Sequence, residues 1–256
     1  MAHTLLKKSS LFLVGASLMG AALPAMADIT DFTVLDDPAN AKSPFVGNAE
    51  AGYTGNSGNS SSSNLNAAFT STWYNNPSSY SLWANATNSK SSGSRTGERY
   101  GLGGRSRYNL DKLNYLFGQA SWESNRFSGY RDRYILDGGY GRQIWTGPNN
   151  TLSVEVGPGF RHDVYTHGAG SKNRVILYGA ATYTHRFSKS ATFSEKLATE
   201  VAAGNTTTSS VSALNVAINS RFTLALSYSL ENNTHPYGGA THKTDTTTAV
   251  SIIYGF

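Results

Sequence analysis

The chain has 256 residues, no cysteine and a formal net charge of +5. The absence of cysteine excludes a disulfide framework, a thiolate zinc site and a cysteine nucleophile, and so mild a positive charge argues against dedicated nucleic-acid binding. Only 39% of the residues are hydrophobic. That fraction is low for a soluble domain with a large core, but it fits a membrane barrel, because each strand turns only half of its side chains toward lipid.

The first 27 residues are predicted to be a signal peptide. Lys7 and Lys8 precede the apolar run 11–23, and small residues flank a cleavage site at Ala25 and Ala27, so the mature chain is expected to begin at Asp28. No other run approaches the roughly 20 apolar residues of a membrane helix. Residues 28–44 are acidic and interrupted by proline, which indicates a periplasmic lead-in of low order near the mouth of the following domain.

From residue 45 to the end, apolar and polar residues alternate with a period of two in segments separated by turn residues, which predicts β-strands. An even number of such strands is typical of outer-membrane barrels. We therefore expect residues 45–256 to form an all-β, antiparallel transmembrane β-barrel of about 12 strands. The expected strands are 45–55, 60–73, 78–89, 97–110, 114–125, 131–143, 150–162, 174–187, 190–202, 208–219, 221–232 and 244–256.

The connections between these segments predict an orientation. The longer connections, 90–96, 165–173 and 233–243, each join an odd strand to the next even one. If both ends of the barrel domain are periplasmic, all three lie outside the cell and the short turns inside, as in known barrels. The Ser-, Asn- and Thr-rich stretches 56–63 and 205–210 are expected to be hydrated turns or loops.

Alternation also separates a lipid face from a lumen face. Aromatic residues on the lipid face fall near both ends of the strands, as two girdles would, and Glu195 is one exception that puts a charge there. Charges of both signs fall on the lumen face. They predict either a narrow pore that attracts anions or a lumen closed by ion pairs between arginines and carboxylates. The lumen-lining candidates are Arg99, Arg105, Arg107, Arg131, Arg133, Asp137, Glu155, Arg161, Arg174 and Arg186.

The last segment resembles the closing strand of a bacterial outer-membrane barrel. Val250, Ile252, Tyr254 and Phe256 form one apolar face that ends on a terminal aromatic residue. The resemblance implies that the barrel-assembly machinery recognises this strand and that the barrel lies in contact with outer-membrane lipids.

Several longer stretches carry a resemblance to one family. They are the run from Pro44 to Asn48, YLFGQASW at 115–122, GYGRQ at 139–143 and SALNVAIN at 212–219. Over almost the whole mature chain the sequence is similar to the salt-induced outer-membrane proteins of the YdiY type. The resemblance implies an outer-membrane barrel linked by name to salt or osmotic stress, with no cofactor and no catalytic or ligand residues to transfer.

An outer-membrane hydrolase acting on lipid or peptide is the alternative, and it would need a nucleophile or activated water beside a base. His162 and Asp163 are adjacent on a strand, so they point to opposite faces and cannot act together. His235 and His242 share the last outer loop with Asp245, an arrangement more typical of solvated loop residues than of a metal site. We therefore expect no enzyme activity, no catalytic residue and no metal site, while the oligomeric state is not specified. The remaining histidine candidates are His167 and His185.

Overall fold

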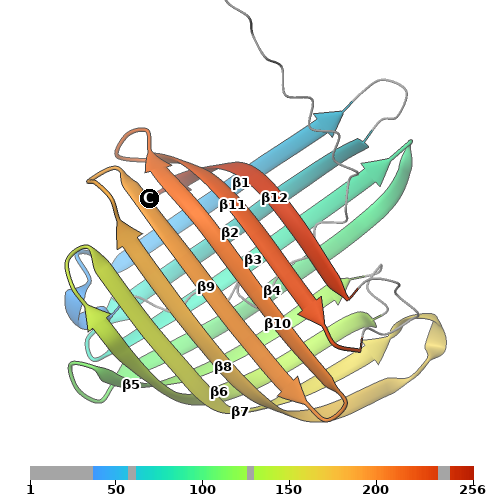
Figure 1. Ribbon diagram of the computed structural model, residues 1–256, viewed down its shortest axis with the longest axis horizontal. Helices are drawn as coiled ribbons and strands as arrows, with labels where there is room; N and C mark the ends of the chain where they lie inside the picture. Colours follow the sequence, from blue (N-terminus) through green and yellow to red (C-terminus); the bar gives the residue numbers. More distant parts are fainter. Residues whose placement is uncertain (1–36, 57–61, 126–129, 236–242) are drawn as a thin grey trace, which may run out of the picture.

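The computed structural model describes residues 37–56, 62–125, 130–235 and 243–256 (Figure 1). The predicted signal peptide, with Ala25, Ala27 and Asp28 at its cleavage site, lies outside these residues, as does the first part of the predicted lead-in. Among the described residues, no helix is long and apolar enough to cross a membrane.

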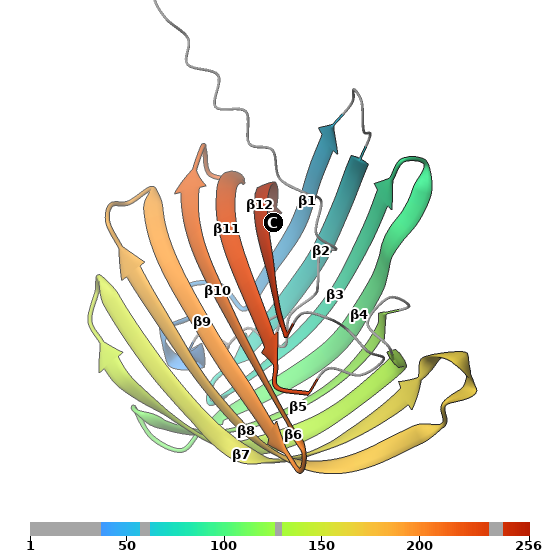
Figure 2. The ribbon, with the colours of Figure 1, turned by 45° about the vertical axis from the view of Figure 1, so that its right-hand side comes forward.

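Twelve antiparallel strands form a closed barrel in the described part of the chain, which confirms the predicted fold class (Figures 1 and 2). Each strand pairs with its neighbours in sequence, and β1 pairs with β12 to close the ring. Short 3₁₀ turns, η2 (Pro38–Asn40) and η3 (Thr166–Gly168), are the helical elements described. The strands are β1 (Phe45–Asn56), β2 (Ser62–Asn75), β3 (Ser78–Ser91), β4 (Ser94–Asn109), β5 (Asn114–Asn125), β6 (Tyr130–Thr146), β7 (Asn150–Tyr165), β8 (Ser171–Arg186), β9 (Ala191–Ala202), β10 (Asn205–Ala217), β11 (Phe222–Asn233) and β12 (Thr244–Gly255).

The two faces of the strands follow the predicted alternation. On β4, Tyr100 and Leu102 are 43% and 55% exposed on the outside of the barrel, whereas Arg99 and Arg105 are 3% and 4% exposed inside it. The cross-strand partners keep the same side, since Arg105 lies between Ser81 of β3 and Gln119 of β5. A slip of one residue would put arginines into lipid, so the hydrophobic pattern fixes this register.

The exceptional lipid-face charge, Glu195, is on the outside as predicted. Its carboxylate oxygens accept hydrogen bonds from the hydroxyls of Ser210, at 2.6 Å, and Ser212. Both serines lie on the neighbouring strand β10, so they offset part of the cost of placing a carboxylate on that face.

Two of the predicted loops are wrong. The expected connection 90–96 is a two-residue turn, in which Ser92 and Gly93 have φ of 49° and 81° and allow β3 and β4 to extend toward each other. The expected loop 205–210 is the first half of β10, because the turn before it tightens at Gly204, whose φ is 80°. Residues 165–173 shorten to the connection 166–170, and parts of 56–63 and 233–243 lie outside the described residues.

Five short connections lie at the end of the barrel where β1 begins and β12 ends, and we call it the short-turn end. They comprise residues 76–77, 110–113, 147–149, 187–190 and 218–221. The described part of the lead-in also lies at this end, where the Asp37 carboxylate accepts a hydrogen bond from the side-chain amide of Asn109, at 2.5 Å, and lies 3.7 Å from the Arg107 guanidinium.

Candidate functional site in the lumen

The inward side chains divide the lumen into two unlike halves. On the wall formed by β4 to β9, large charged and aromatic side chains predominate, and most of these are buried. On the wall formed by β10 to β12, β1 and β2 they are small and mostly neutral. The filled wall and the small-residue wall, as we call them, are described in turn.

A first charged layer of the filled wall centres on Arg105 and Glu155. Their side chains form an ion pair in which neither is exposed, although β4 and β7 are separated by two other strands. The Arg105 guanidinium also donates to the Gln119 side-chain oxygen at 2.7 Å, and the Tyr115 hydroxyl donates to Glu155 at 2.9 Å. Each partner fixes the position of the next, so this layer is a rigid support and not a set of mobile pore charges.

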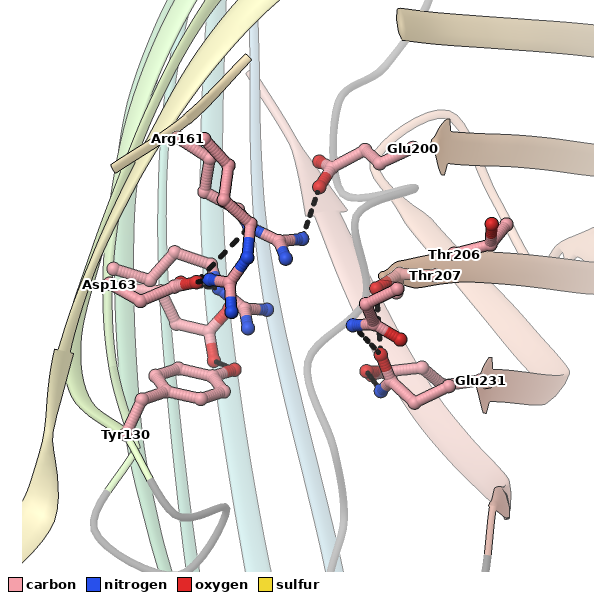
Figure 3. A network of polar contacts seen from close by, with 12 residues as sticks. Tyr130, Arg161, Asp163, Glu200, Thr206, Thr207 and Glu231 are labelled. Carbon is pink, nitrogen blue, oxygen red and sulfur yellow. Dashed lines mark hydrogen bonds and ion pairs between the residues drawn. The ribbon is translucent and has the colours of Figure 1, made fainter. Parts of the chain in front are cut away.

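A second layer converges on Asp163 of β7. Its carboxylate is paired with Arg133, at 2.7 Å, with Arg161, at 3.3 Å, and with Arg174. Arg161 also reaches from β7 to Glu200 of β9, at 2.9 Å, and Figure 3 shows this side chain extended between the two strands. Two carboxylates therefore hold three guanidinium groups, and most of the positive charge in this layer is neutralised.

Neighbouring groups complete the second layer. The ring of Tyr130 lies 3.8 Å below the Arg133 guanidinium, and its hydroxyl donates to Glu123, which also pairs with Arg99 at 2.8 Å. On the facing strands of Figure 3, the Thr207 hydroxyl donates to Asn233 at 2.7 Å, and Asn233 donates to the half-buried Glu231 at 2.9 Å.

An apolar cluster crosses the lumen. It joins Trp83 of β3, Phe117 of β5, Tyr178 of β8 and Ala198 of β9. Because β3 and β9 are six strands apart in either direction around the ring, the cluster reaches from one side of the barrel to the other. Glycine makes room for these rings, since a Cβ at Gly103 would lie 2.0 Å from a ring carbon of Trp83.

The small-residue wall is different because its inward side chains are partly exposed within the barrel at most levels. Near the short-turn end, a cavity of about 350 Å³ is lined along five strands by Asn48, Glu50, Ala68, Thr70, Asn215, Thr223 and Ile253. Among these residues Glu50 is the charged one. The open part of the lumen is therefore displaced to one side and bounded largely by hydroxyl, amide and methyl groups.

Most predicted lumen residues lie in this site. Arg99, Arg105, Arg107, Arg133, Asp137, Glu155 and Arg161 are buried inside the barrel, and Arg174 joins them through Asp163. Asp137 is 5% exposed beside its cross-strand partner Gln119, and no hydrogen bond of normal geometry reaches either of its oxygens. Arg186 lies apart from this group, exposed at the short-turn end.

The prediction for Arg131 is wrong. The pairing of β6 with β7 shifts between Tyr130 and Asp132, so one extra residue is accommodated there. Tyr130 consequently takes the inward position, and Arg131 is 64% exposed and pairs with Asp132 at 2.7 Å. The inward aromatic residues Trp83, Tyr115, Phe117 and Tyr178 were missed by an analysis of charges alone, although they lie on the same face as the arginines.

The histidines do not gather into a reactive group. His162 is on the outer face, bonded to Asn173 at 2.5 Å and packed against Tyr134, whereas Asp163 points inward. His185 bonds to Asn150 at 2.7 Å. His242 and the side chain of His167 lie outside what the structure describes. Within the described residues, no group of three or more His, Cys, Asp or Glu side chains could hold a metal ion.

The terminal strand has its predicted face. Val250, Ile252 and Phe256 are 58%, 43% and 54% exposed on the outside of the barrel, and Tyr254 stacks with Phe256 at 6.0 Å between ring centroids.

Comparisons with known proteins agree with this architecture. Residues 49–256 match the family described as "Protein of unknown function, DUF481". The chain is 45% identical over 250 residues to the uncharacterized protein YdiY of Escherichia coli K12, and the aligned residues cover 98% of both chains.

Two solved structures share the fold at low sequence identity. An outer-membrane channel of the COG4313 group from Pseudomonas putida F1 matches with a TM-score of 0.53 and 10% identity, covering 83% of this chain and 95% of that one. The translocator domain of the autotransporter NalP from Neisseria meningitidis matches with a TM-score of 0.51 and 11% identity, covering 85% and 89%. The fold is therefore that of an outer-membrane β-barrel.

Proposed function

We propose that this chain, a member of the DUF481 family of proteins of unknown function, forms a narrow passive pore for small polar solutes in the bacterial outer membrane. The observation that carries the proposal is the division of the lumen into a filled wall and a partly exposed small-residue wall. A barrel whose only role was structural would gain stability by filling both halves, since packed side chains stabilise and voids do not.

The proposed location has three supports. The sequence begins with a predicted export signal, the large outward side chains are mostly apolar, and the fold is shared with outer-membrane barrels. With an even number of strands, both ends of the barrel domain lie on one side, and we place the short-turn end in the periplasm. A role in salt or osmotic adaptation is part of the proposal and comes from the family resemblance.

The selectivity that we propose differs between levels of the lumen. Arg105, Arg133 and Arg161 each pair with a carboxylate, so the middle of the lumen offers little net charge to a passing ion. Any preference for anions is therefore expected from the mouths of the pore. The hydrolase alternative has no support from the described histidines, and we do not propose it.

Two neighbouring alanines allow a matched test. Ala68 lines the cavity of the small-residue wall, whereas Ala67 is exposed on the outer face of the same strand. In planar bilayers, the refolded mature protein should give steady conductance steps. Ala68→Trp should reduce the step size at least twofold because the indole occupies the passage, and Ala67→Trp should leave it unchanged.

The same recording decides between the pore and a closed structural barrel. Folding is checked beforehand by the mobility shift that a barrel shows on gels before and after boiling. Folded wild-type protein that gives no steps, or steps that Ala68→Trp does not reduce, would contradict the proposed pore.

A further inference from the structure

The short-turn end contains a second cavity, distinct from the one on the small-residue wall. Its volume is about 590 Å³, within the usual range for small-molecule sites. Its lining comes from separate parts of the chain: the lead-in, the ends of β1, β2, β4, β6, β7 and β8 that lie nearest the short turns, and the 147–148 turn. We call it the vestibule, because it lies at the mouth of the lumen.

The charge of the vestibule is unbalanced. Its charged lining residues are Asp37, Lys42, Arg107 and Arg186. The carboxylate of Asp37 is already engaged, since it accepts from Asn109 and caps the η2 turn by accepting from the backbone N–H of Ala39 at 3.0 Å. Among the described residues, one shared carboxylate therefore faces three cations, in contrast to the largely paired charges of the filled wall.

Two of these cations have no partner in the part of the chain that the structure describes. Within the described residues, the ammonium of Lys42 and the guanidinium of Arg186 make no hydrogen bond or ion pair with another protein group, although both line the cavity. Arg107 is held more firmly, with its Nε donating to Asn109 at 2.9 Å and its guanidinium 3.9 Å from the ring centre of Tyr115. The vestibule thus combines one positioned guanidinium with two further cations that are able to adjust to a ligand.

We infer that the vestibule binds small organic oxyanions that carry at least two negative charges, as carboxylates or phosphates. Arg and Lys provide charge-assisted hydrogen bonds to such groups, and Gln143 and Thr184, which also line the cavity, add neutral polar groups. Val46 and the ring of Tyr74, which lie on the inward face and also line the cavity, provide an apolar surface for the carbon skeleton. As a loading site for solutes, the vestibule rests on the proposed pore, but binding itself does not require conduction.

The test uses the refolded mature protein in non-ionic detergent at low salt, titrated calorimetrically with citrate as the carboxylate probe and inorganic phosphate as the phosphate probe. We expect saturable binding of at least one of them. The double variant Lys42→Gln/Arg186→Gln should weaken binding at least tenfold, because each lost charged contact is worth about a factor of ten. Glycerol, which is neutral, should give only heat of dilution.

A matched control removes the same charge from the same end of the barrel. Lys189 and Arg221 lie in the turns 187–190 and 218–221 and do not line the vestibule, so Lys189→Gln/Arg221→Gln should bind like the wild type. Equal weakening by both double variants would indicate a general charge effect, and absence of saturation in the wild type would indicate no site. Either result overturns the inference.

The outcomes separate this inference from the proposed function. Saturable binding that depends on Lys42 and Arg186, in a protein that gives no conductance steps, would retain the site and reject the pore. If Ala68→Trp reduced the conductance but neither probe bound saturably, the pore would be retained and the binding site rejected.

Discussion

Asp163 is the residue on which most of the buried positive charge depends. Its side chain is 2% exposed and pairs with Arg133, Arg161 and Arg174, none of which is more than 14% exposed. Removing one partner of a buried ion pair leaves the other charge without compensation, and that is costlier than replacing the whole pair with apolar groups.

We therefore expect Asp163→Asn to destabilise the barrel by about 3 to 5 kcal/mol. The measurement is equilibrium unfolding in urea of the protein refolded into lipid bilayers, followed by tryptophan fluorescence. Arg174→Gln should have a smaller effect, because Arg133 and Arg161 still neutralise Asp163. If Asp163→Asn unfolded at the wild-type urea concentration, the network would not be a stabilising element.

The inward position of these residues could be predicted from the sequence, but their pairing could not. A period of two assigns a side chain to a face, whatever strands lie opposite. Glu155 meets Arg105 from 50 positions away and across two intervening strands, which no local pattern encodes. For Arg131 the period of two predicts the wrong face, because the bulge after Tyr130 adds one residue to the strand and turns Arg131 outward.

At the scale of the strand, the closest backbone approach described is between β6 and β7. A Cβ at Gly139 would lie 2.1 Å from the carbonyl oxygen of Val156, and one at Gly157 would lie 2.1 Å from that of Gly138. Since the obstacle is backbone, a rotamer change cannot relieve it.

Gly139→Ala should accordingly cost roughly 1 to 3 kcal/mol, as overpacking does elsewhere. Gly118→Ala on β5 is the matched control, since its Cβ would approach only the hydroxyl of Ser106, at 3.7 Å, and its effect should be close to zero. Unfolding in urea would compare the two. Equal effects would mean that the strands separate freely at Gly139.

The turn between β4 and β5 provides a pH prediction outside the membrane-spanning strands. The side-chain amide of Asn114 donates to the Asp111 carboxylate at 2.7 Å, and the backbone N–H groups of Leu113 and Asn114 each donate at 2.8 Å. These bonds lower the pKa of Asp111 below its ordinary value of 3.8, with the Asn114 side chain as the largest cause. The stabilisation of the turn is therefore complete above the ordinary pKa and is lost as the pH falls through the lowered one.

A carboxyl ¹³C titration followed by NMR should find the Asp111 midpoint below that of the same residue in the urea-unfolded chain. Asn114→Ala should raise the midpoint, because the largest contribution is removed. A midpoint at or above the unfolded value would show that the three hydrogen bonds do not favour the charged carboxylate.

For the whole molecule, the ring of strands was predictable because alternation persists over more than 200 residues of sequence. The division of the lumen was also present in the sequence. Inward positions change from arginine and aromatic residues on β4 to β8 to small neutral residues on β10 to β12. An analysis of charges alone does not reveal this division, because the open side of the lumen is marked by small inward side chains and not by a change of charge. The two-residue turn after β3 was missed because its first residue, Ser92, adopts a left-handed conformation that is more typical of glycine.

Closure of the ring depends on a short seam between the first and last strands. The ladder between β1 and β12 pairs Asn48 to Ala51 with Ile252 to Gly255, whereas β1 pairs with β2 along its whole length. Phe256 extends the seam, since its backbone exchanges hydrogen bonds of 2.9 and 3.0 Å with Gly47. Its ring lies over Gly47, where a Cβ would be 2.4 Å from the ring, and 6.2 Å from the rings of Phe45 and Phe69.

We expect Phe256→Ala to weaken this seam by about 1 to 2 kcal/mol, because the aromatic contacts between β12 and the first two strands are lost. The refolded protein should lose its heat-modifiable gel mobility at a lower temperature than the wild type. Phe187→Ala is the control, since Phe187 is 63% exposed on the outer face away from the seam. Refolding in detergent involves no assembly machinery, so an effect there belongs to the seam. An effect found only in cells would assign Phe256 to recognition instead, and equal melting of both variants would remove its role in closure.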